Sequence, residues 1–197
     1  MYISPIQEEI LVAGILGDGN FKKNGSNYCY RENHSARELG YLTWKFNMLN
    51  GLTANAGIVH EKPKGFSKDG VYSFSTKTNV SFNKYALMGV DEAIENLTPF
   101  GLLLFLLDDG WVSYGAYERN WHFLISGGML SLNQLQRLCD KMNDFGITDA
   151  KIIGNVRNDI TIPKHNNDLF CDLVVENNMQ NLDVVQKKFQ YSSIIMG

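Results

Sequence analysis

An internal repeat limits what this chain can fold into more than any other feature of its sequence. Residues 11–21 (LVAGILGDGNF) recur as residues 102–112 (LLLFLLDDGWV), and each copy places an apolar run before Asp-Gly and an aromatic residue. Two more blocks follow each copy in the same order: a periodic apolar segment that ends in Gly51-Leu-Thr or Gly146-Ile-Thr, then Tyr72-Ser-Phe-Ser or Ile160-Thr-Ile-Pro. Three matches in one order indicate a duplicated structural unit.

Each unit has the pattern helix, two strands, helix, two strands, helix. Apolar residues at i, i+3, i+7 and i+10 before a Gly predict the middle helices, and alternation in residues 111–114 and 121–125 predicts strands. We therefore predict an α+β fold of two pseudo-symmetric αββαββα repeats, residues 1–96 and 97–197. Expected helices are near 5–17, 35–50, 79–88, 98–108, 130–145 and from about 165; expected strands are near 19–34, 57–61, 70–77, 110–126 and 150–162.

Composition indicates a globular intracellular protein. A hydrophobic content of 44%, with 12% aromatic residues, is enough for a real core. The three cysteines, Cys29, Cys139 and Cys171, show no CxxC spacing, which predicts free thiols in a reducing compartment. The N-terminal residues show no signal-peptide pattern, and the longest apolar run, Phe100–Leu107, is too short to span a membrane. A net charge of −3 argues weakly against a nucleic-acid partner.

Asp18 and Asp109 end the first helix of each repeat and are the first candidates for chemistry. A carboxylate at a helix C-terminus costs roughly 0.3–1 kcal/mol against the helix dipole, and a divalent cation would offset this cost. Ala13, Gly14 and Gly17 form a stripe of small residues that would allow a second helix to approach. Two such helices would bring both carboxylates to shared metal ions, an arrangement suited to phosphodiester hydrolysis. A single Asp-Gly after a helix is usually an ordinary turn, but two at equivalent places favour a site.

The same residues resemble a known family. Leu11–Gly19 resembles the LAGLIDADG signature of homing endonucleases, and Leu102–Gly110 resembles a divergent second copy. Leu97-Thr-Pro followed by Asp108-Asp-Gly resembles the "LTP…DDG" form of one subfamily, as do residues 41–45 and the late residues Phe170 and 186–189. The resemblance covers nearly the whole chain. It implies a monomeric, two-motif enzyme with a saddle of antiparallel strands that grips double-stranded DNA and cleaves it with Mg²⁺. Asp18 and Asp109 carry over as metal ligands; Asp108 is less expected, because the family ligand directly precedes the Gly.

Family members also place a basic residue in each active site. In the second repeat, Lys187 or Lys188 is near the matching position. In the first repeat, the segment Met88–Ile94 carries acids instead, so Lys84 or Lys77 would have to substitute. The sequence therefore leaves open whether both DNA strands are cut.

Basic and polar residues along the expected strands are candidates for phosphate and base contacts. In the first repeat these candidates are Lys22, Lys23, Asn27, Arg31, His34, His60, Lys62, Lys64, Lys68 and Lys77. In the second repeat they are Arg119, Asn120, His122, Lys151 and Arg157. The first set is more basic, which predicts that the first repeat dominates nucleic-acid affinity.

Two other functions compete with the endonuclease hypothesis. A LAGLIDADG protein that has lost catalysis could bind structured RNA, as a maturase or as part of an RNA–protein particle; the acidic balance and Asp91-Glu92 favour this alternative. A transcription regulator on the same fold has no further DNA-binding motif to support it. The retained Asp18 and Asp109 favour an endonuclease encoded in an intron or mobile element, whose target sequence and host compartment the chain does not specify.

Overall fold

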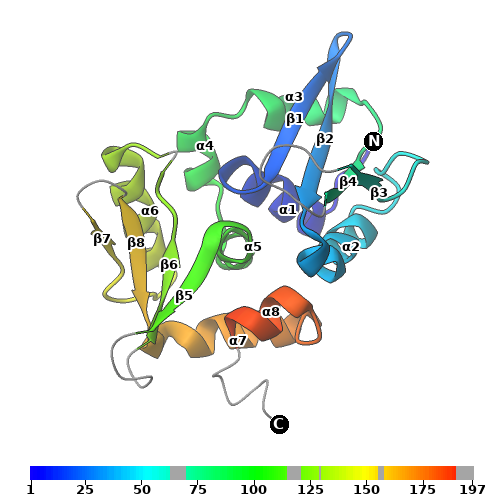
Figure 1. Cartoon of the computed structure of the whole chain (residues 1–197). Coiled ribbons are helices and arrows are strands. Elements are labelled where there is room, and N and C mark those ends of the chain that lie inside the picture. The colour runs from blue at the N-terminus through cyan, green and yellow to red at the C-terminus, as the bar shows by residue number, and fades with distance from the viewer. Residues whose placement is uncertain (63–69, 115–120, 129, 155–157, 190–197) are drawn as a thin grey trace.

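A computed structural model describes residues 1–62, 70–114, 121–128, 130–154 and 158–189 of the chain. It has a mixed α/β architecture with two four-stranded antiparallel sheets. Figure 1 shows the two sheets on either side of a central pair of helices, with the other helices packed around them.

The first half runs from α1 to the short helix α4 (Val90–Glu95). It contains α1 (Pro5–Leu16), β1 (Gly19–Asn24), β2 (Asn27–His34), the 3₁₀ turn η1 (Ala36–Glu38), α2 (Leu39–Met48), β3 (Val59–Glu61), β4 (Val71–Ser75), the 3₁₀ turn η2 (Val80–Phe82) and α3 (Asn83–Leu87). A capping box between Ser4 and Gln7, with Pro5 at the first helical position, starts α1. The strands are ordered β1-β2-β4-β3.

The second half repeats this order. After α4 (Val90–Glu95) it contains α5 (Pro99–Asp109), β5 (Gly110–Tyr114), β6 (Trp121–Ile125), α6 (Leu132–Asp144), β7 (Lys151–Ile153), β8 (Asp159–Pro163), the 3₁₀ turn η3 (Lys164–Asn166), α7 (Asn167–Glu176) and α8 (Asp183–Lys188). Its strands are ordered β5-β6-β8-β7, the same topology as in the first sheet. The two four-stranded antiparallel sheets confirm the predicted fold class.

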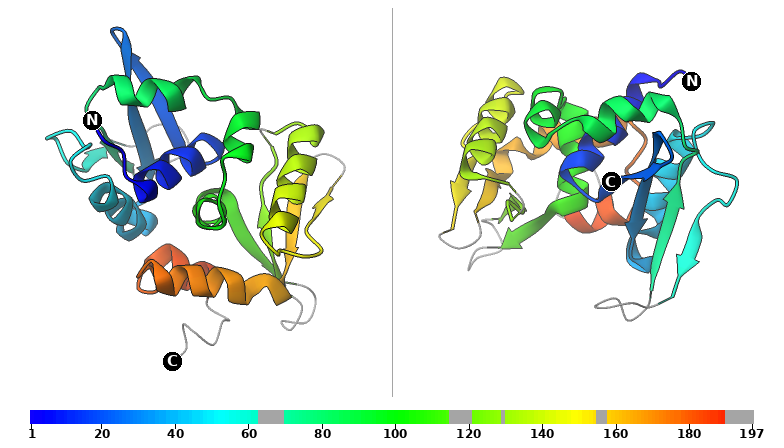
Figure 2. Two further views of the ribbon diagram at one scale, coloured as in Figure 1. Left: turned by 180° about the vertical axis from the view of Figure 1, so that it is seen from behind. Right: turned by 90° about the horizontal axis from the view of Figure 1, so that it is seen from above.

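The two motif helices, α1 and α5, pack against each other at the centre of the molecule, as predicted (Figure 2). Every residue from Gly101 to Leu107 of α5 is buried. Protein surrounds this part of the helix, which explains why it is apolar on all sides. One residue of the small-residue stripe, Gly14, does not lie against α5 as predicted. Gly17 makes room for α5, since a Cβ there would lie 2.6 Å from Asp108 Oδ2, but Gly14 makes room for the Tyr30 hydroxyl of β2.

The predicted elements were found in their predicted order, with two additions. The sequence pattern did not predict α4 and α8, each only six residues long, because so short a helix shows less than two turns of periodicity. No helix within the described ranges is long and apolar enough to cross a membrane. Cys29, Cys139 and Cys171 are free thiols.

Candidate functional site

Carboxylates from both motif copies meet where α1 and α5 end. Asp18 follows the C-cap Gly17 of α1, and Asp109 is the last residue of α5. Burial and the nearby Asp108 raise the pKa of Asp18 to about 6, and Asp109 adds to this effect. Burial and Asp108 likewise raise the pKa of Asp109. Asp109 thus contributes to the raised pKa of Asp18, and the raised pKa of each carboxyl group means that both resist ionisation in the absence of added positive charge.

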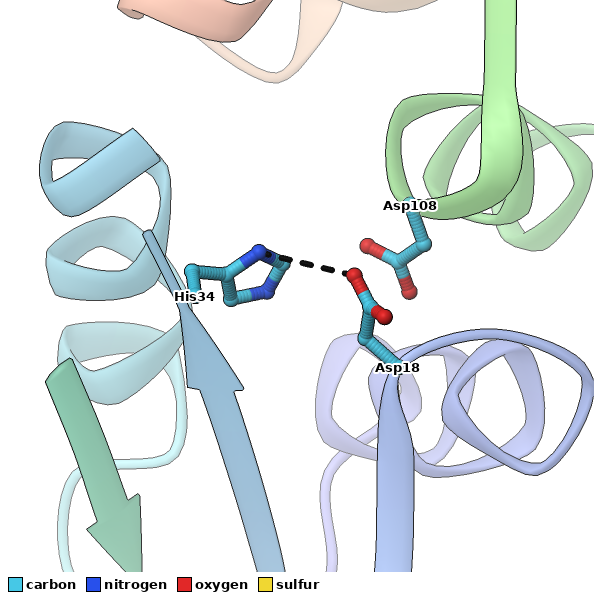
Figure 3. A group of neighbouring side chains, drawn as sticks. All are labelled: Asp18, His34 and Asp108. Atoms are coloured by element: carbon cyan, nitrogen blue, oxygen red, sulfur yellow. Dashed lines mark ion pairs between the residues drawn. The ribbon is translucent and has the colours of Figure 1, made fainter. Parts of the chain in front are cut away.

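Asp108 lies closer to the centre of this site than the sequence suggested. One ligand atom each from Asp18, His34 and Asp108 lie within 4.8 Å of one another (Figure 3). His34 Nδ1 is 3.5 Å from Asp18 Oδ2. His34 ends β2, whereas the two acids come from α5 and the end of α1, so the group joins both halves of the molecule.

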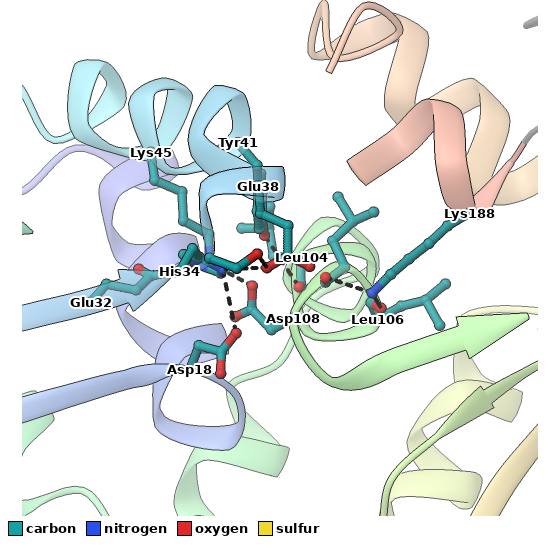
Figure 4. A network of polar contacts seen from close by, with 12 residues as sticks. Asp18, Glu32, His34, Glu38, Tyr41, Lys45, Leu104, Leu106, Asp108 and Lys188 are labelled. Carbon is teal, nitrogen blue, oxygen red and sulfur yellow. Dashed lines mark hydrogen bonds and ion pairs between the residues drawn. The ribbon is translucent and has the colours of Figure 1, made fainter. Parts of the chain in front are cut away.

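A buried polar network supports this group from the first half (Figure 4). Lys45 of α2 is fully buried; its Nζ donates to a Glu32 oxygen and, at 2.7 Å, to Asp108 Oδ1. His34 Nε2 is 2.8 Å from Glu32 Oε1. Burial opposes the charge on Glu32, but Lys45 and His34 outweigh it and hold its pKa at about 2. Burial likewise opposes the charge on His34, but its hydrogen bonds to Glu32 and Glu38 raise its pKa to about 10. Glu32 and His34 are therefore both charged at neutral pH.

Lys188 is the cation that the second half contributes. It is buried near the end of α8, and its Nζ donates to the carbonyl oxygens of Leu106 at 3.0 Å and Leu107 at 2.6 Å, in the last turn of α5. A positive charge at a helix C-terminus is favourable. Burial lowers the pKa of Lys188 to about 8. A cavity of about 240 Å³ opens beside it, lined by Glu38, Asp108, Gly110, Trp111, Val112, Lys187 and Lys188. Lys187 itself is exposed.

The first half has no matching lysine at the end of α4. In α8, Lys188 lies three residues after the buried pair Val184 and Val185. The residue three positions after the buried pair Ala93 and Ile94 of α4 is Leu97, so an apolar side chain occupies the position that corresponds to Lys188. Lys84 does not substitute, because it pairs on the surface with Glu8, which is ten residues, or roughly 15 Å of helix, before Asp18. Lys77 is exposed. Asp91 and Glu95, in contrast, form ion pairs with Arg137 of α6; these acids of α4 therefore have a structural role.

The outer face of the first sheet is the candidate nucleic-acid surface there. Residues directly opposite on paired strands share a face: Arg31 pairs with Asn20 and Ser75, and Lys22 with Cys29. The other face, which carries Tyr30, Glu32 and Phe74, is buried under helices. Among the predicted contacts, Lys22, Lys23 and Lys62 are exposed. Arg31 is ion-paired with Glu61, and Asn27 accepts a hydrogen bond from Asn83.

Two predicted nucleic-acid contacts on this sheet need correction. His34 is only 4% exposed and points into the carboxylate group, because the alternation of β2 turns it to the helix-covered face. His60 lies opposite Tyr72, and Tyr72 lies opposite His34, so all three residues belong to the inner face of the sheet. The His60 ring stacks on Tyr72, but His60 is exposed at the edge of the sheet.

The second sheet offers a concave outer surface. A hollow of about 540 Å³ there is lined by Trp121, His122, Lys151, Ile153, Thr161, Pro163, Lys164 and His165. It includes two of the predicted contacts, His122 and Lys151. The remaining predicted contacts, Lys64, Lys68, Arg119, Asn120 and Arg157, are outside the described residues.

Sequence reasoning missed Glu32 and Lys45 and undervalued Asp108. The alternation of β2 places Glu32 on the buried face of the strand, together with Tyr30. Lys45 lies on the face of α2 that also carries Tyr41 and Leu42. A lysine in register with apolar residues of a helix was the available signal, since such a lysine needs a buried partner.

Comparisons with known proteins agree with this geometry. The model of the LAGLIDADG DNA endonuclease family matches residues 8–169. The homing endonuclease I-WcaI, bound to its DNA recognition sequence, superposes with a TM-score of 0.74 at 20% identity, over 90% of this chain and 84% of that one. A variant of the homing endonuclease I-DmoI, in complex with its target DNA in the presence of Mn, superposes with a TM-score of 0.51 at 15% identity, over 89% of this chain and 94% of that one. No curated protein matches the sequence.

Proposed function

Because this chain belongs to the LAGLIDADG DNA endonuclease family, we propose that it is a site-specific endonuclease that hydrolyses double-stranded DNA with a divalent cation. The observation that carries this proposal is the packing of α1 against α5, which places Asp18 and Asp109 at the ends of adjacent helices, where Asp109 contributes to the raised pKa of Asp18. The two sheets on either side would flank a duplex. I-WcaI and I-DmoI, which have this fold, bind DNA.

The residues fit a metal-dependent reaction. Asp18 and Asp109 would hold the cation, with Mg²⁺ as the ion that the family resemblance implies, and the donor set is rich in the carboxylate oxygens that such ions prefer. When bound, the cation would polarise the phosphodiester and assist the attacking water. Lys188 would hold a positive charge beside the cavity between α8 and β5, while Lys22 and Lys151 on the outer sheet faces would contact phosphates. We propose that a single chain suffices, since it supplies both motif copies.

The decisive experiment is cleavage of a randomised duplex library in Mg²⁺, with sequencing of the cut ends. Wild type should cut at one recurring sequence. Asp18→Asn and Asp109→Asn should each slow cutting by about 10³-fold or more, because a metal contribution of several kcal/mol is lost. Both variants should still bind the target duplex, since phosphate contacts supply most of the affinity. Undiminished cutting by both variants would refute the assigned roles.

One argument for the RNA-binding alternative was the acidic segment Asp91-Glu92, but Asp91 forms an ion pair with Arg137. It would be favoured over the endonuclease by a single result: tight binding of structured RNA by wild type with no measurable binding or cutting of DNA. Sequencing the nucleic acid that co-purifies with the protein tests this directly.

A further inference from the structure

The group of Asp18, His34 and Asp108 goes beyond the pair of motif acids, because it includes an imidazole nitrogen. Its three ligand atoms lie within 4.8 Å of one another, whereas two ligands on one metal ion are at most about 4.2 Å apart at bond lengths near 2.1 Å. Small side-chain movements would therefore bring all three onto one ion.

Asp108 supplies the second observation. Its side chain is fully buried, and Oδ1 accepts from Lys45. Oδ2 has no hydrogen-bond partner within the described part of the chain. It lies against Gly17, where a Cβ would be 2.6 Å away, and the carboxyl group points at Asp18 (Figure 3). A buried carboxylate oxygen without a partner is costly, and a cation between Asp108 and Asp18 would satisfy it.

His34 is oriented for the same ion. Its Nε2 is 2.8 Å from Glu32 Oε1, so this nitrogen is held by a carboxylate, and Nδ1 faces Asp18. Metal-binding histidines are commonly fixed in this way, with a carboxylate on the nitrogen that does not bind the metal. Two carboxylate oxygens, Asp18 Oδ2 at 3.5 Å and Glu38 Oε2 at 3.6 Å, lie near Nδ1, so a cation there would face negative charge. A metal ion would take the place of the Nδ1 proton.

We propose that the protein, free of DNA, binds one divalent transition-metal ion between Asp18 Oδ, His34 Nδ1 and Asp108 Oδ2. The nitrogen ligand favours Mn²⁺ and the later first-row ions over Mg²⁺, which prefers oxygen ligands alone. This site shares Asp18 with the pair proposed for catalysis but does not use Asp109. It requires no DNA cleavage, so it stands or falls separately from the proposed function.

Mn²⁺ binding to the DNA-free protein, followed by electron paramagnetic resonance, tests the proposal. The bound Mn²⁺ should show coupling to one ¹⁴N nucleus, and His34→Asn should remove that coupling. Asp108→Asn should weaken Mn²⁺ binding by about tenfold or more, since even the loss of a supporting residue costs that much. Asp109→Asn should keep the ¹⁴N coupling, the exposed Asp168→Asn should leave the affinity unchanged, and Mg²⁺ should compete poorly with Mn²⁺.

Circular dichroism and melting in metal-free buffer would establish that each variant folds. If His34→Asn does not fold, the ¹⁴N coupling of wild type and the contrast in affinity between Asp108→Asn and Asp168→Asn still decide the question. Absence of ¹⁴N coupling in wild type, or an affinity in Asp108→Asn equal to that in Asp168→Asn, would overturn the proposal.

Discussion

The two halves of the molecule share one topology but differ in polarity at equivalent positions. Gly19 faces Glu32 across the first hairpin, whereas Gly110 faces Ile125 across the second. In the last turn of the following helix, the first half buries Lys45 and the second half buries Met142. The first half thus buries the ion pair between Glu32 and Lys45, whereas the strand and helix of the second half bury apolar side chains.

The difference is reversed at the helices that follow β4 in the first half and β8 in the second. There the second half buries Lys188 against the carbonyl oxygens of α5, and the first half buries Leu97. Each half therefore brings one buried lysine to the central carboxylates, but from a different helix: α2 in the first half and α8 in the second. Both copies keep the apolar periodicity that the fold requires, but the buried lysine comes from a different helix in each copy.

The largest effect expected from this comparison concerns stability. Lys45→Met leaves Glu32 and Asp108 buried without their shared cation. Removing one partner of a buried ion pair costs about 3–5 kcal/mol, so the free energy of unfolding in urea should fall by that amount. The matched control is Met142→Leu, which preserves volume and should cost less than about 1.5 kcal/mol. Equal losses in the two variants would mean that the network contributes nothing specific to the first half.

A second prediction uses the lysine of the other half. Lys188→Met should slow cleavage of one DNA strand by about 10²-fold while the other strand is cut at nearly the wild-type rate, as expected for the loss of one positioned basic group. Burial lowers the pKa of Lys188 to about 8; the side chain is therefore charged below that pH and loses its charge as pH rises through it. In wild type, the rate on the same strand should fall above about pH 8.

Strand-specific end-labelling of a single duplex measures both rates in one reaction, with Lys187→Met as the exposed neighbour for control. Equal slowing of the two strands by Lys188→Met would place this lysine in a role common to both halves.

The sequence predicted the parts of this molecule that depend on periodicity. The order of helices and strands, the packing of α1 on α5 and the approach at Gly17 all followed from repeated apolar spacing. The network around Lys45 did not, because its partners Glu32 and Asp108 are 13 and 63 residues away. No local pattern reports which acid a buried lysine will meet. His34 was assigned to the DNA surface for a similar reason: its residue type suited a contact, but its place in the alternation of β2 decided its direction.

The last comparison concerns charge on the two outer sheet faces, and it predicts the smallest effects. The sequence predicted that the first repeat dominates binding, but Arg31 is neutralised by Glu61. Among the described residues, each half offers an outer-face lysine for a direct test: Lys22 beside Cys29 on β1 and β2, and Lys151 beside Thr161 on β7 and β8. Each change, Lys22→Ala or Lys151→Ala, should lower the slope of log K against log salt by about 0.9 on duplex DNA.

Lys23→Ala is the matched control, because Lys23 pairs with Tyr28 and belongs to the opposite face. The slope measured for Lys23→Ala should stay at the wild-type value. A loss with Lys22→Ala and none with Lys151→Ala would restore the predicted dominance of the first repeat, whereas equal losses with Lys22→Ala and Lys23→Ala would show that the outer face does not define the DNA surface.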